Sequence, residues 1–369
     1  MSTTNLEMGI IGLPNVGKST LFNAITKAGA EAANYPFCTI EPNVGVVDVP
    51  DARLEVLSKM FNSKRIVPAG MRFVDIAGLV KGASKGEGLG NKFLAHIRQV
   101  DALAEVVRCF DDGNITHVEG TIDPVRDIEI INTELCLADM ESIDKQIIKL
   151  RKLVKARDKT APEKMKVLEK IADALGNAIP ARQVELTKEE KAVLSEAELL
   201  TLKPILYVAN VAEEDAADYS KNHYVADLLE YAKKENAQVI VISAKVESEI
   251  AELPPEEAKE YLAVAGLSEA GLDRLIKAGF QLLGLQTFLT AGEMESRAWT
   301  IVKGFTAPQA AGKIHTDFER GFIKAEIVSY KDLVACGSKQ AAKEKGLVRM
   351  EGKEYIMQDG DVVEFRFNV

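Results

Sequence analysis

Short apolar runs alternate with helical patterns over much of the chain. Five runs are apolar enough to form buried strands, at residues 8–12, 71–75, 104–110, 204–210 and 238–243. A helical stretch, 18–28, follows the first run. Short apolar strands that alternate with helices are typical of a parallel sheet covered on both faces. The pattern predicts an α/β fold whose sheet is interrupted between about residues 126 and 200.

The interrupting segment has heptad-like spacing. Apolar residues step by three and four along two stretches, one holding Met140, Ile143, Ile147, Leu150 and Val154, the other Met165, Leu168, Ala172, Leu175 and Ile179. A turn signal lies between them at 160–162. This spacing predicts an antiparallel helical hairpin whose first arm, about 30 residues long, reaches roughly 45 Å.

Charge is uneven along this hairpin. Residues 145–170 carry three acidic residues and ten basic ones, Lys145, Lys149, Arg151, Lys152, Lys155, Arg157, Lys159, Lys164, Lys166 and Lys170, a net charge of +7. Two interpretations stay open: a solvated helical face, or a tip that contacts RNA or the ribosome.

The pattern changes again from about residue 286. A helix is predicted at 338–345, and short strands are predicted at 302–304, 322–330, 347–350, 355–357 and 362–367. Glycine-containing turns separate several of them. This part of the chain is predicted to form a small α+β domain.

Composition and charge argue against several classes of protein. The chain of 369 residues is 47% hydrophobic and has a net charge of −10, which disfavours a protein that coats nucleic acid along its whole length. It has no apolar run of 18 residues, so no membrane span is expected, and no signal peptide is visible at its start. The four cysteines form no CxxC pair and are predicted to be reduced thiols. The expected location is the cytoplasm.

Residues Gly12 to Ser19 read G-x-x-x-x-G-K-S between a predicted strand and a predicted helix. Such a loop wraps a phosphate closely, because its glycines leave room and its backbone N–H groups and the helix N-terminus supply positive potential. Lys18 is expected to reach the β- and γ-phosphates, and the Ser19 hydroxyl to ligate Mg²⁺.

Two further elements would complete a triphosphate site. Asp75 ends a predicted strand and begins Asp-Ile-Ala-Gly, so its carboxylate can hold Mg²⁺ through water while the N–H of Gly78 approaches the γ-phosphate. Thr39, in the polar loop 34–40, is the natural second hydroxyl for Mg²⁺. The alternative is a loop threonine without that role.

Base choice is predicted from Asn210-Val211-Ala212-Glu213, which follows a predicted strand. GTPases have N-K-x-D there, with the Asp accepting hydrogen bonds from guanine. Here Val211 replaces the Lys, and Glu213 is one methylene longer than the Asp, so the acceptor is misplaced for guanine. Missing hydrogen bonds decide specificity strongly, which predicts ATP over GTP. The tripeptide Ser243-Ala244-Lys245 fits the loop that closes over the base.

The group that would orient the attacking water is not the usual glutamine. Leu79 stands where many GTPases place a glutamine, so intrinsic hydrolysis should be slow unless another group acts. His117, in a polar loop after a core strand, is the best candidate, the alternative being a surface histidine. The glycine-rich segment 81–90 is either a switch that orders with nucleotide or simply a flexible loop.

These motifs together resemble the YchF-type Obg-like ATPases, which are translation-factor-class P-loop NTPases. The resemblance rests on residues 12–20, 34–43, 75–90 and 210–213 and covers nearly the whole chain. It implies a Ras-like G domain with a helical coiled-coil insertion and a C-terminal β-grasp module of the TGS type. The expected boundaries are 1–125 with 200–283 for the nucleotide-binding domain, 126–199 for the coiled coil and 284–369 for the TGS-like domain.

The resemblance also implies Mg²⁺-dependent ATP hydrolysis and association with ribosomes. It places an adenine contact at Val211, Mg²⁺ ligands at Ser19 and Thr39, and phosphate contacts at Asn15, Val16, Gly17, Lys18, Ser19 and Thr20. It leaves K⁺ open as an extra activating cation. The expected protein is a monomer that binds neither membrane nor DNA. A GTPase of the same fold and a nucleotide-gated scaffold with negligible turnover are the alternatives.

Overall fold

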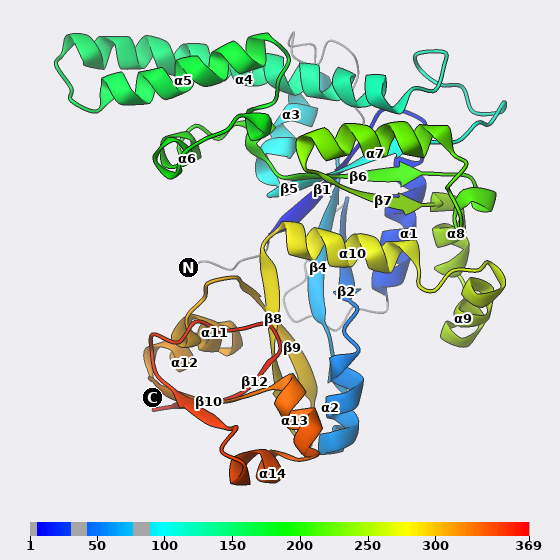
Figure 1. Cartoon of the computed structure of the whole chain (residues 1–369), viewed down its shortest axis with the longest axis vertical. Coiled ribbons are helices and arrows are strands. Elements are labelled where there is room, and N and C mark those ends of the chain that lie inside the picture. The colour runs from blue at the N-terminus through cyan, green and yellow to red at the C-terminus, as the bar shows by residue number, and fades with distance from the viewer. Residues whose placement is uncertain (1–5, 31–42, 77–88, 369) are drawn as a thin grey trace. The chain divides into compact units, whose positions relative to one another are not determined.

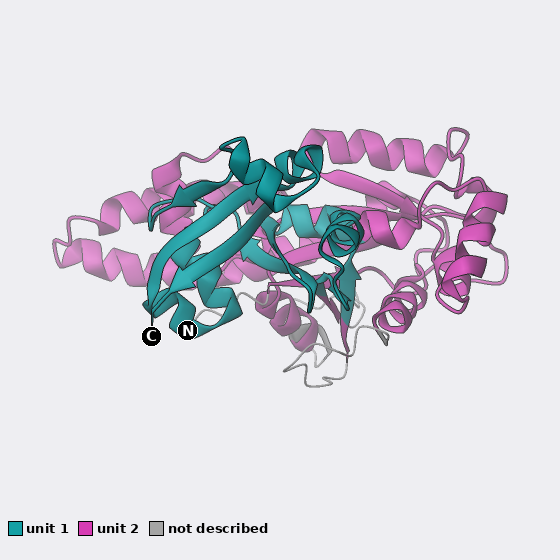
Figure 2. Ribbon diagram, turned by 90° about the horizontal axis from the view of Figure 1, so that it is seen from below, with its two compact units in different colours: residues 1–5, 46–71, 276–369 teal, residues 6–45, 72–275 magenta. Residues whose placement is uncertain are grey.

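The structure, a computed structural model, describes residues 6–30, 43–76 and 89–368 (Figure 1). The chain forms two compact units (Figure 2). The larger unit comprises residues 6–45 and 72–275, and the smaller unit contains residues 46–71 and 276–369. The division expected from the sequence, at 125/126, 199/200 and 283/284, stays a prediction.

A six-stranded sheet confirms the predicted α/β class. Its order is β2-β4-β1-β5-β6-β7, with β1 Glu7–Ile11, β2 Val44–Val49, β4 Ala69–Asp75, β5 Ala102–Arg108, β6 Ile205–Asn210 and β7 Gln238–Ile242. In this order the strands β4, β1, β5, β6 and β7 are all parallel, each paired with its neighbour. Every residue of β5 and β6 is buried, as expected for central strands covered on both faces. The strand β2 is the one that the hydrophobic pattern missed.

Helices follow the strands of this sheet along the chain. They are α1 Lys18–Ala30, α3 Leu89–Gln99, α7 His223–Glu235, α8 Ala244–Ile250, α9 Pro255–Val264 and α10 Gly271–Leu282. Short polar side chains begin two of them: Asn222 accepts from the backbone of α7, and Ser243 accepts from the backbone of α8. Such caps satisfy N–H groups that have no partner inside the helix. The start of α8 is thereby fixed directly after β7.

The predicted helical hairpin consists of α4 Pro124–Lys155 and α5 Ala161–Gly176, which lie side by side (Figure 1). Pro124 occupies the first position of α4, where its missing N–H costs nothing. The seam is apolar and includes the buried Ile143, Ile147, Leu168, Ile171 and Leu175. The second arm is shorter than predicted, because α5 ends at Gly176 and Ile179 is 42% exposed. The chain returns through η2 Ala181–Gln183, α6 Lys188–Ser195 and η3 Leu200–Leu202.

A buried polar cluster joins the base of the hairpin to the sheet. Arg182 donates to Asn132 on α4 at 2.8 Å and lies 3.5 Å from Glu235, whose carboxylate accepts from Tyr207 at 2.6 Å. Beside them Glu105 is almost fully buried, and its Oε2 has no hydrogen-bond partner in the described part of the chain. Burial raises the pKa of Glu105 well above its ordinary value, although the charge of Arg182 opposes this shift.

Replacing Glu105 with glutamine should therefore stabilise the protein above pH 5. Between the ordinary pKa of 4.5 and the raised pKa, the unfolded chain has lost a proton that the folded chain keeps. The wild-type free energy of unfolding then falls by about 1.4 kcal/mol per pH unit relative to Glu105→Gln. Urea unfolding from pH 4.5 to 8 measures this difference. A difference that is the same at every pH would contradict the assignment.

The smaller unit is built on a second six-stranded sheet, of order β11-β10-β12-β8-β9-β3. The strands are β3 Ile66–Val67, β8 Leu285–Ala291, β9 Ser296–Val302, β10 Phe322–Ser329, β11 Arg349–Glu351 and β12 Asp361–Phe367. The helices are α2 Arg53–Phe61, α11 Ala307–Ile314, α12 Thr316–Arg320, α13 Tyr330–Cys336 and α14 Lys339–Glu344. β8 and β12 pair in parallel within an otherwise mostly antiparallel sheet. Its core is aromatic and aliphatic, including Phe288, Ile301 and Phe365.

The predicted strands 322–330 and 362–367 are confirmed in this unit. The strand predicted at 355–357 is wrong, because that segment makes only an isolated bridge between Ile356 and Thr306. The strand predicted at 302–304 is in fact the end of β9 and the turn that follows it. β8 was missed because its polar residues Gln286, Thr287 and Thr290 mask the apolar alternation.

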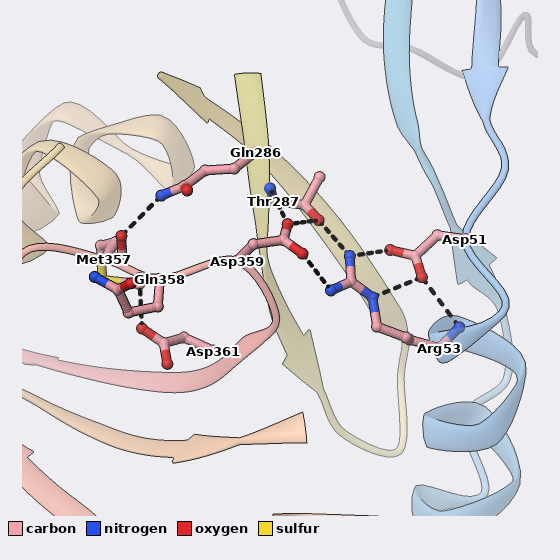
Figure 3. Close-up of polar contacts among 8 residues, drawn as sticks. All are labelled: Asp51, Arg53, Gln286, Thr287, Met357, Gln358, Asp359 and Asp361. Atoms are coloured by element: carbon pink, nitrogen blue, oxygen red, sulfur yellow. Dashed lines mark hydrogen bonds and ion pairs between the residues drawn. The ribbon is translucent and has the colours of Figure 1, made fainter. Parts of the chain in front are cut away.

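Arg53 is one link between residues 46–71 and the C-terminal strands of the same unit (Figure 3). Its guanidinium donates to both carboxylate oxygens of Asp51 at 2.8 and 2.7 Å, to Asp359 at 2.8 Å and to the Thr287 hydroxyl at 2.9 Å. Asp359 also accepts from the backbone N–H of Thr287 at 3.0 Å. A bidentate Arg–carboxylate pair fixes geometry as well as charge. The network therefore fastens the start of α2 to β8 and to the loop before β12.

The described residues also bear on the expectations about membrane spans and cysteines. No helix among them is both long and apolar enough to span a membrane. Cys109, Cys136 and Cys336 carry free thiols, as predicted, whereas Cys38 lies outside the described residues.

Candidate functional site

Positive φ angles shape the loop between β1 and α1. Gly17 has φ of 97°, and a Cβ built on it would lie 2.1 Å from Nδ2 of Asn210. Asn15 also has positive φ, 65°, a conformation that asparagine tolerates better than most residues. The backbone carbonyl of Gly17 accepts from the N–H of Leu21 at 3.0 Å and so begins the helix. This is the compact strand–loop–helix arrangement that the motif predicts.

Asn210, at the end of β6, holds three predicted segments together. Its Nδ2 donates to the carbonyl of Val16 at 2.8 Å, and its Oδ1 accepts from the N–H of Ala244 at 2.9 Å. The side chain is almost fully buried, so both bonds are shielded from water. One amide therefore fixes the phosphate-binding loop, the end of β6 and the start of α8 relative to one another.

These segments surround a cavity of about 870 Å³. Asn15 and Gly17 line it from the loop, Thr20 lines it from the first turn of α1, and residues 210–214 and 243–245 line it from the ends of β6 and β7. A volume of several hundred Å³ is usual for a small-molecule or cofactor site. Its place at the carboxyl ends of parallel strands is where open α/β sheets bind their ligands.

The predicted site residues divide into three groups. Eight line the cavity: Asn15, Gly17, Thr20, Asn210, Val211, Glu213, Ser243 and Ala244. Five are described but are not among its lining residues: Val16, Lys18, Ser19, Asp75 and His117. Thr39, Gly78, Leu79 and the segment 81–88 lie outside the described residues.

Lys18 and Asp75 form an ion pair beside the loop, with Nζ of Lys18 hydrogen-bonded to Oδ1 of Asp75. Ser19, next in the chain, is exposed. A serine hydroxyl and a carboxylate are oxygen donors that suit Mg²⁺, which usually keeps several waters and takes further ligands from phosphates. No group of three or more His, Cys, Asp or Glu side chains in the described residues could hold a metal alone. The oxygen atoms of Ser19 and Asp75 thus fit a magnesium ion that takes its remaining ligands from water and from a bound phosphate group.

His117 lies in the loop after β5, as predicted, and its side chain is buried there. Its Nε2 lies 2.8 Å from Oδ2 of Asp127, and its Nδ1 accepts from the N–H of Glu119 at 3.2 Å. The side chain is only 3% exposed, so the alternative of a surface histidine is wrong. Because both ring nitrogens have partners and the ring does not line the cavity, this geometry gives no support to the predicted catalytic role.

Arg108 is a site residue that sequence reasoning missed. It is buried at the end of β5 and donates to the backbone carbonyls of Phe110, Asp112 and Ile115 at 3.0–3.2 Å. These three residues line the cavity. Arg108 therefore shapes one wall of the cavity, and the available signal was an arginine at the end of a mostly apolar strand.

Comparison with known proteins identifies the family. A family model described as a 50S ribosome-binding GTPase matches residues 7–152, and a YchF-GTPase C-terminal model, described as a protein of unknown function, matches 285–368. The chain is 61% identical to the ribosome-binding ATPase YchF of Bacillus subtilis, over 99% of this chain and 100% of that protein. The chain belongs to the YchF family. It is also 55% identical to the Escherichia coli O157:H7 YchF, over 98% of this chain and 99% of that one.

The structure agrees with membership in the YchF family. The solved YchF GTPase of Schizosaccharomyces pombe superposes with a TM-score of 0.89 at 40% identity, over 99% of each chain. The resemblance inferred from the motifs is therefore confirmed. The names of these relatives differ in one respect, because the bacterial YchF proteins are called ATPases and the fission-yeast YchF a GTPase.

Proposed function

We propose that this chain is a ribosome-binding ATPase that holds ATP and Mg²⁺ in the cavity beside its phosphate-binding loop. The observation that carries this proposal is the Asn210 amide. It holds the phosphate-binding loop, the end of β6 and the start of α8 together around one cavity. Full-length identity of 61% to a ribosome-binding ATPase supports the same activity. A ribosome-binding ATPase acts in the cytoplasm.

The phosphates are assigned to Asn15, Val16, Gly17, Lys18, Ser19 and Thr20. The adenine is assigned to Asn210, Val211, Glu213, Ser243 and Ala244, which line the cavity from the ends of β6 and β7. Mg²⁺ is assigned to Ser19 and Thr39 directly and to Asp75 through water, and Gly78 to the γ-phosphate. The roles of Thr39 and Gly78, a requirement for K⁺ and a monomeric state stay predictions.

In the mechanism Lys18 changes partners. In the structure its ammonium is paired with Asp75. The β- and γ-phosphates of bound ATP would offer Lys18 more negative charge than Asp75 does, so Lys18 would bind them, and the Asp75 carboxylate would then be free to hold Mg²⁺ through water. Mg²⁺ supplies charge neutralisation at the phosphates when bound. Catalysis is then positioning and electrostatic stabilisation of phosphoryl transfer to water.

Turnover should be slow without a partner. The described part of the cavity lining contains no histidine and no glutamine that could orient a water. Phosphate release from ATP, measured with and without ribosomes, tests this proposal. Stimulation by ribosomes supports a regulatory ATPase, and the absence of turnover under both conditions leaves only a nucleotide-gated scaffold. Faster phosphate release from GTP would favour a GTPase of the same fold.

The chain offers a route from the nucleotide to the smaller unit. β4 begins at Ala69 in the smaller unit and ends at Asp75 in the larger one. Arg53 fastens α2, which precedes β4, to the C-terminal strands. A change at Asp75 on nucleotide binding is therefore continuous in the chain with the segment that carries this network, as nucleotide-dependent control of the smaller unit requires.

Charge reversal at the hairpin tip should weaken ribosome binding. Lys152, Lys155 and Arg157 are exposed where α4 ends. Changing all three to Glu removes up to three phosphate contacts, so affinity at low salt should fall at least about tenfold and its salt dependence should become shallower. Co-sedimentation with ribosomes at several salt concentrations measures both effects.

The matched control places the same charge change on a different surface. Lys221, Lys233 and Lys234 are exposed at or on α7, and their reversal to Glu should leave ribosome binding near the wild-type value. ATP affinity should be unchanged in both triple variants. Equal binding by the tip variant and the wild type at low salt would remove the hairpin tip from the interface.

A further inference from the structure

Lys245 and Glu213 form an ion pair on the wall of the nucleotide cavity. The Lys245 ammonium lies 2.8 Å from Oε2 of Glu213, and both residues line the cavity next to Val211. Lys245 belongs to the first turn of α8, which Asn210 fixes through Ala244. The pair is therefore anchored at its backbone, although its charged ends are half to two-thirds exposed.

The charges around this pair are unequal. Among the cavity-lining residues that the structure describes, Lys245 is the one cation, against five carboxylates at Asp111, Asp112, Glu213, Glu214 and Glu249. The hydrogen bond that Lys245 donates to Glu213 and the charges of Glu213, Glu249 and Glu214 raise the pKa of Lys245 above its ordinary value. The side chain is therefore an ammonium at neutral pH, a donor with no acceptor capacity.

The two purines differ at the ring edge that such a pair can read. Guanine presents an N1–H and a 2-amino group, both donors, whereas adenine presents N1 as an acceptor. A free carboxylate at Glu213 would accept from guanine and would repel the N1 lone pair of adenine. An ammonium does the reverse, because it donates to adenine N1 and meets the N1–H of guanine donor to donor.

We propose that Lys245 is a specificity-determining residue: its ammonium, held by Glu213, donates to N1 of adenine and withholds the Glu213 carboxylate from guanine. This inference rests on the proposed binding of ATP in this cavity and adds the group that reads the base. Glu213 is then a positioning residue for Lys245 and not the direct reader of the base. The longer reach of Glu213, one methylene more than aspartate, suits an ion pair across the cavity wall.

The experiment compares ATP, 1-deaza-ATP and GTP by calorimetric titration of the full chain. 1-Deaza-ATP carries C–H in place of N1 and so lacks the acceptor. The wild type should bind it about tenfold more weakly than ATP, as is usual for a lost hydrogen bond to a charged group. Lys245→Met should lose about the same factor on ATP, show no further loss on 1-deaza-ATP, and bind GTP more tightly than the wild type does.

Three further variants make the result specific. Lys245→Arg keeps a charged donor and should retain most of the preference. The double variant Lys245→Met, Glu213→Gln removes the freed carboxylate and should abolish the gain in GTP affinity. Lys259→Met, at an exposed ion pair on α9 away from the cavity, should match the wild type on all three nucleotides.

The outcomes separate this inference from the proposed function. If the wild type binds ATP but Lys245→Met keeps the wild-type ratio between ATP and 1-deaza-ATP, Lys245 does not read N1 and the inference is overturned. If the wild type binds no ATP at all, the proposed function and the inference both fall. Loss of the ratio in Lys245→Met, with its retention in Lys245→Arg, is the result that we expect.

Discussion

Replacing Lys18 with alanine should lower kcat/KM for ATP hydrolysis by at least about 100-fold, because one preorganised charged donor at a transferring phosphoryl group is worth that much. The loss should fall mainly on kcat if Lys18 stabilises the transition state more than the bound ATP. Steady-state phosphate release at saturating and limiting ATP separates the two parameters.

The control for Lys18 lies on the same helix. Lys27→Ala removes an exposed ammonium paired with Glu252, outside the cavity, and should leave hydrolysis within about twofold of the wild type. Removing Lys18 leaves Asp75 without its ion partner, so thermal unfolding of each variant is needed to show that the fold persists. A folded Lys18→Ala protein that hydrolyses ATP at near the wild-type rate would refute the phosphate assignment.

Gly17→Ala should weaken nucleotide binding by about 100-fold or more. The new methyl group would lie 2.1 Å from Nδ2 of Asn210, and the φ of 97° at this position strains any residue with a Cβ. Asn210 cannot move away without breaking its bonds to Val16 and Ala244. The loop and the start of α8 would therefore separate, and the change would appear as a higher Kd for ATP in a titration.

Gly113→Ala is the matched substitution. Gly113 lies in a loop after β5, and a Cβ on it meets no atom within 4 Å. This variant should bind ATP as the wild type does, with a Tm close to the wild-type value. Equal ATP affinity in Gly17→Ala and Gly113→Ala would show that the loop does not bind ATP in the conformation described.

The features that were predicted well from the sequence are those that depend on residues close together in the chain. The phosphate-binding loop, the buried parallel strands and the hairpin all follow from spacing within about 30 residues. The Asn210 bridge was predicted only as a base contact. Its bond to Val16 spans 194 positions and becomes visible only when β1 and β6 end at the same edge of the sheet.

The features that it missed depend on distant partners. Arg53 contacts Asp359, 306 positions away, and no local pattern indicates that α2 belongs with the C-terminal strands. His117 has its partner only ten residues on, at Asp127, but a polar loop gave no sign that the ring would be buried. The ion pair of Glu213 could not be predicted, because its partner Lys245 lies 32 residues later, after another strand. In each case the role of a charged or polar side chain depends on the partner that lies beside it only in the folded protein.

The most direct test of the account is a competition titration in which ATP and GTP displace the same fluorescent nucleotide from the full chain in the presence of Mg²⁺. The account predicts that ATP displaces it at a concentration at least about tenfold lower than GTP does, since guanine finds its acceptor engaged with Lys245. Displacement by GTP at an equal or lower concentration than ATP would contradict it.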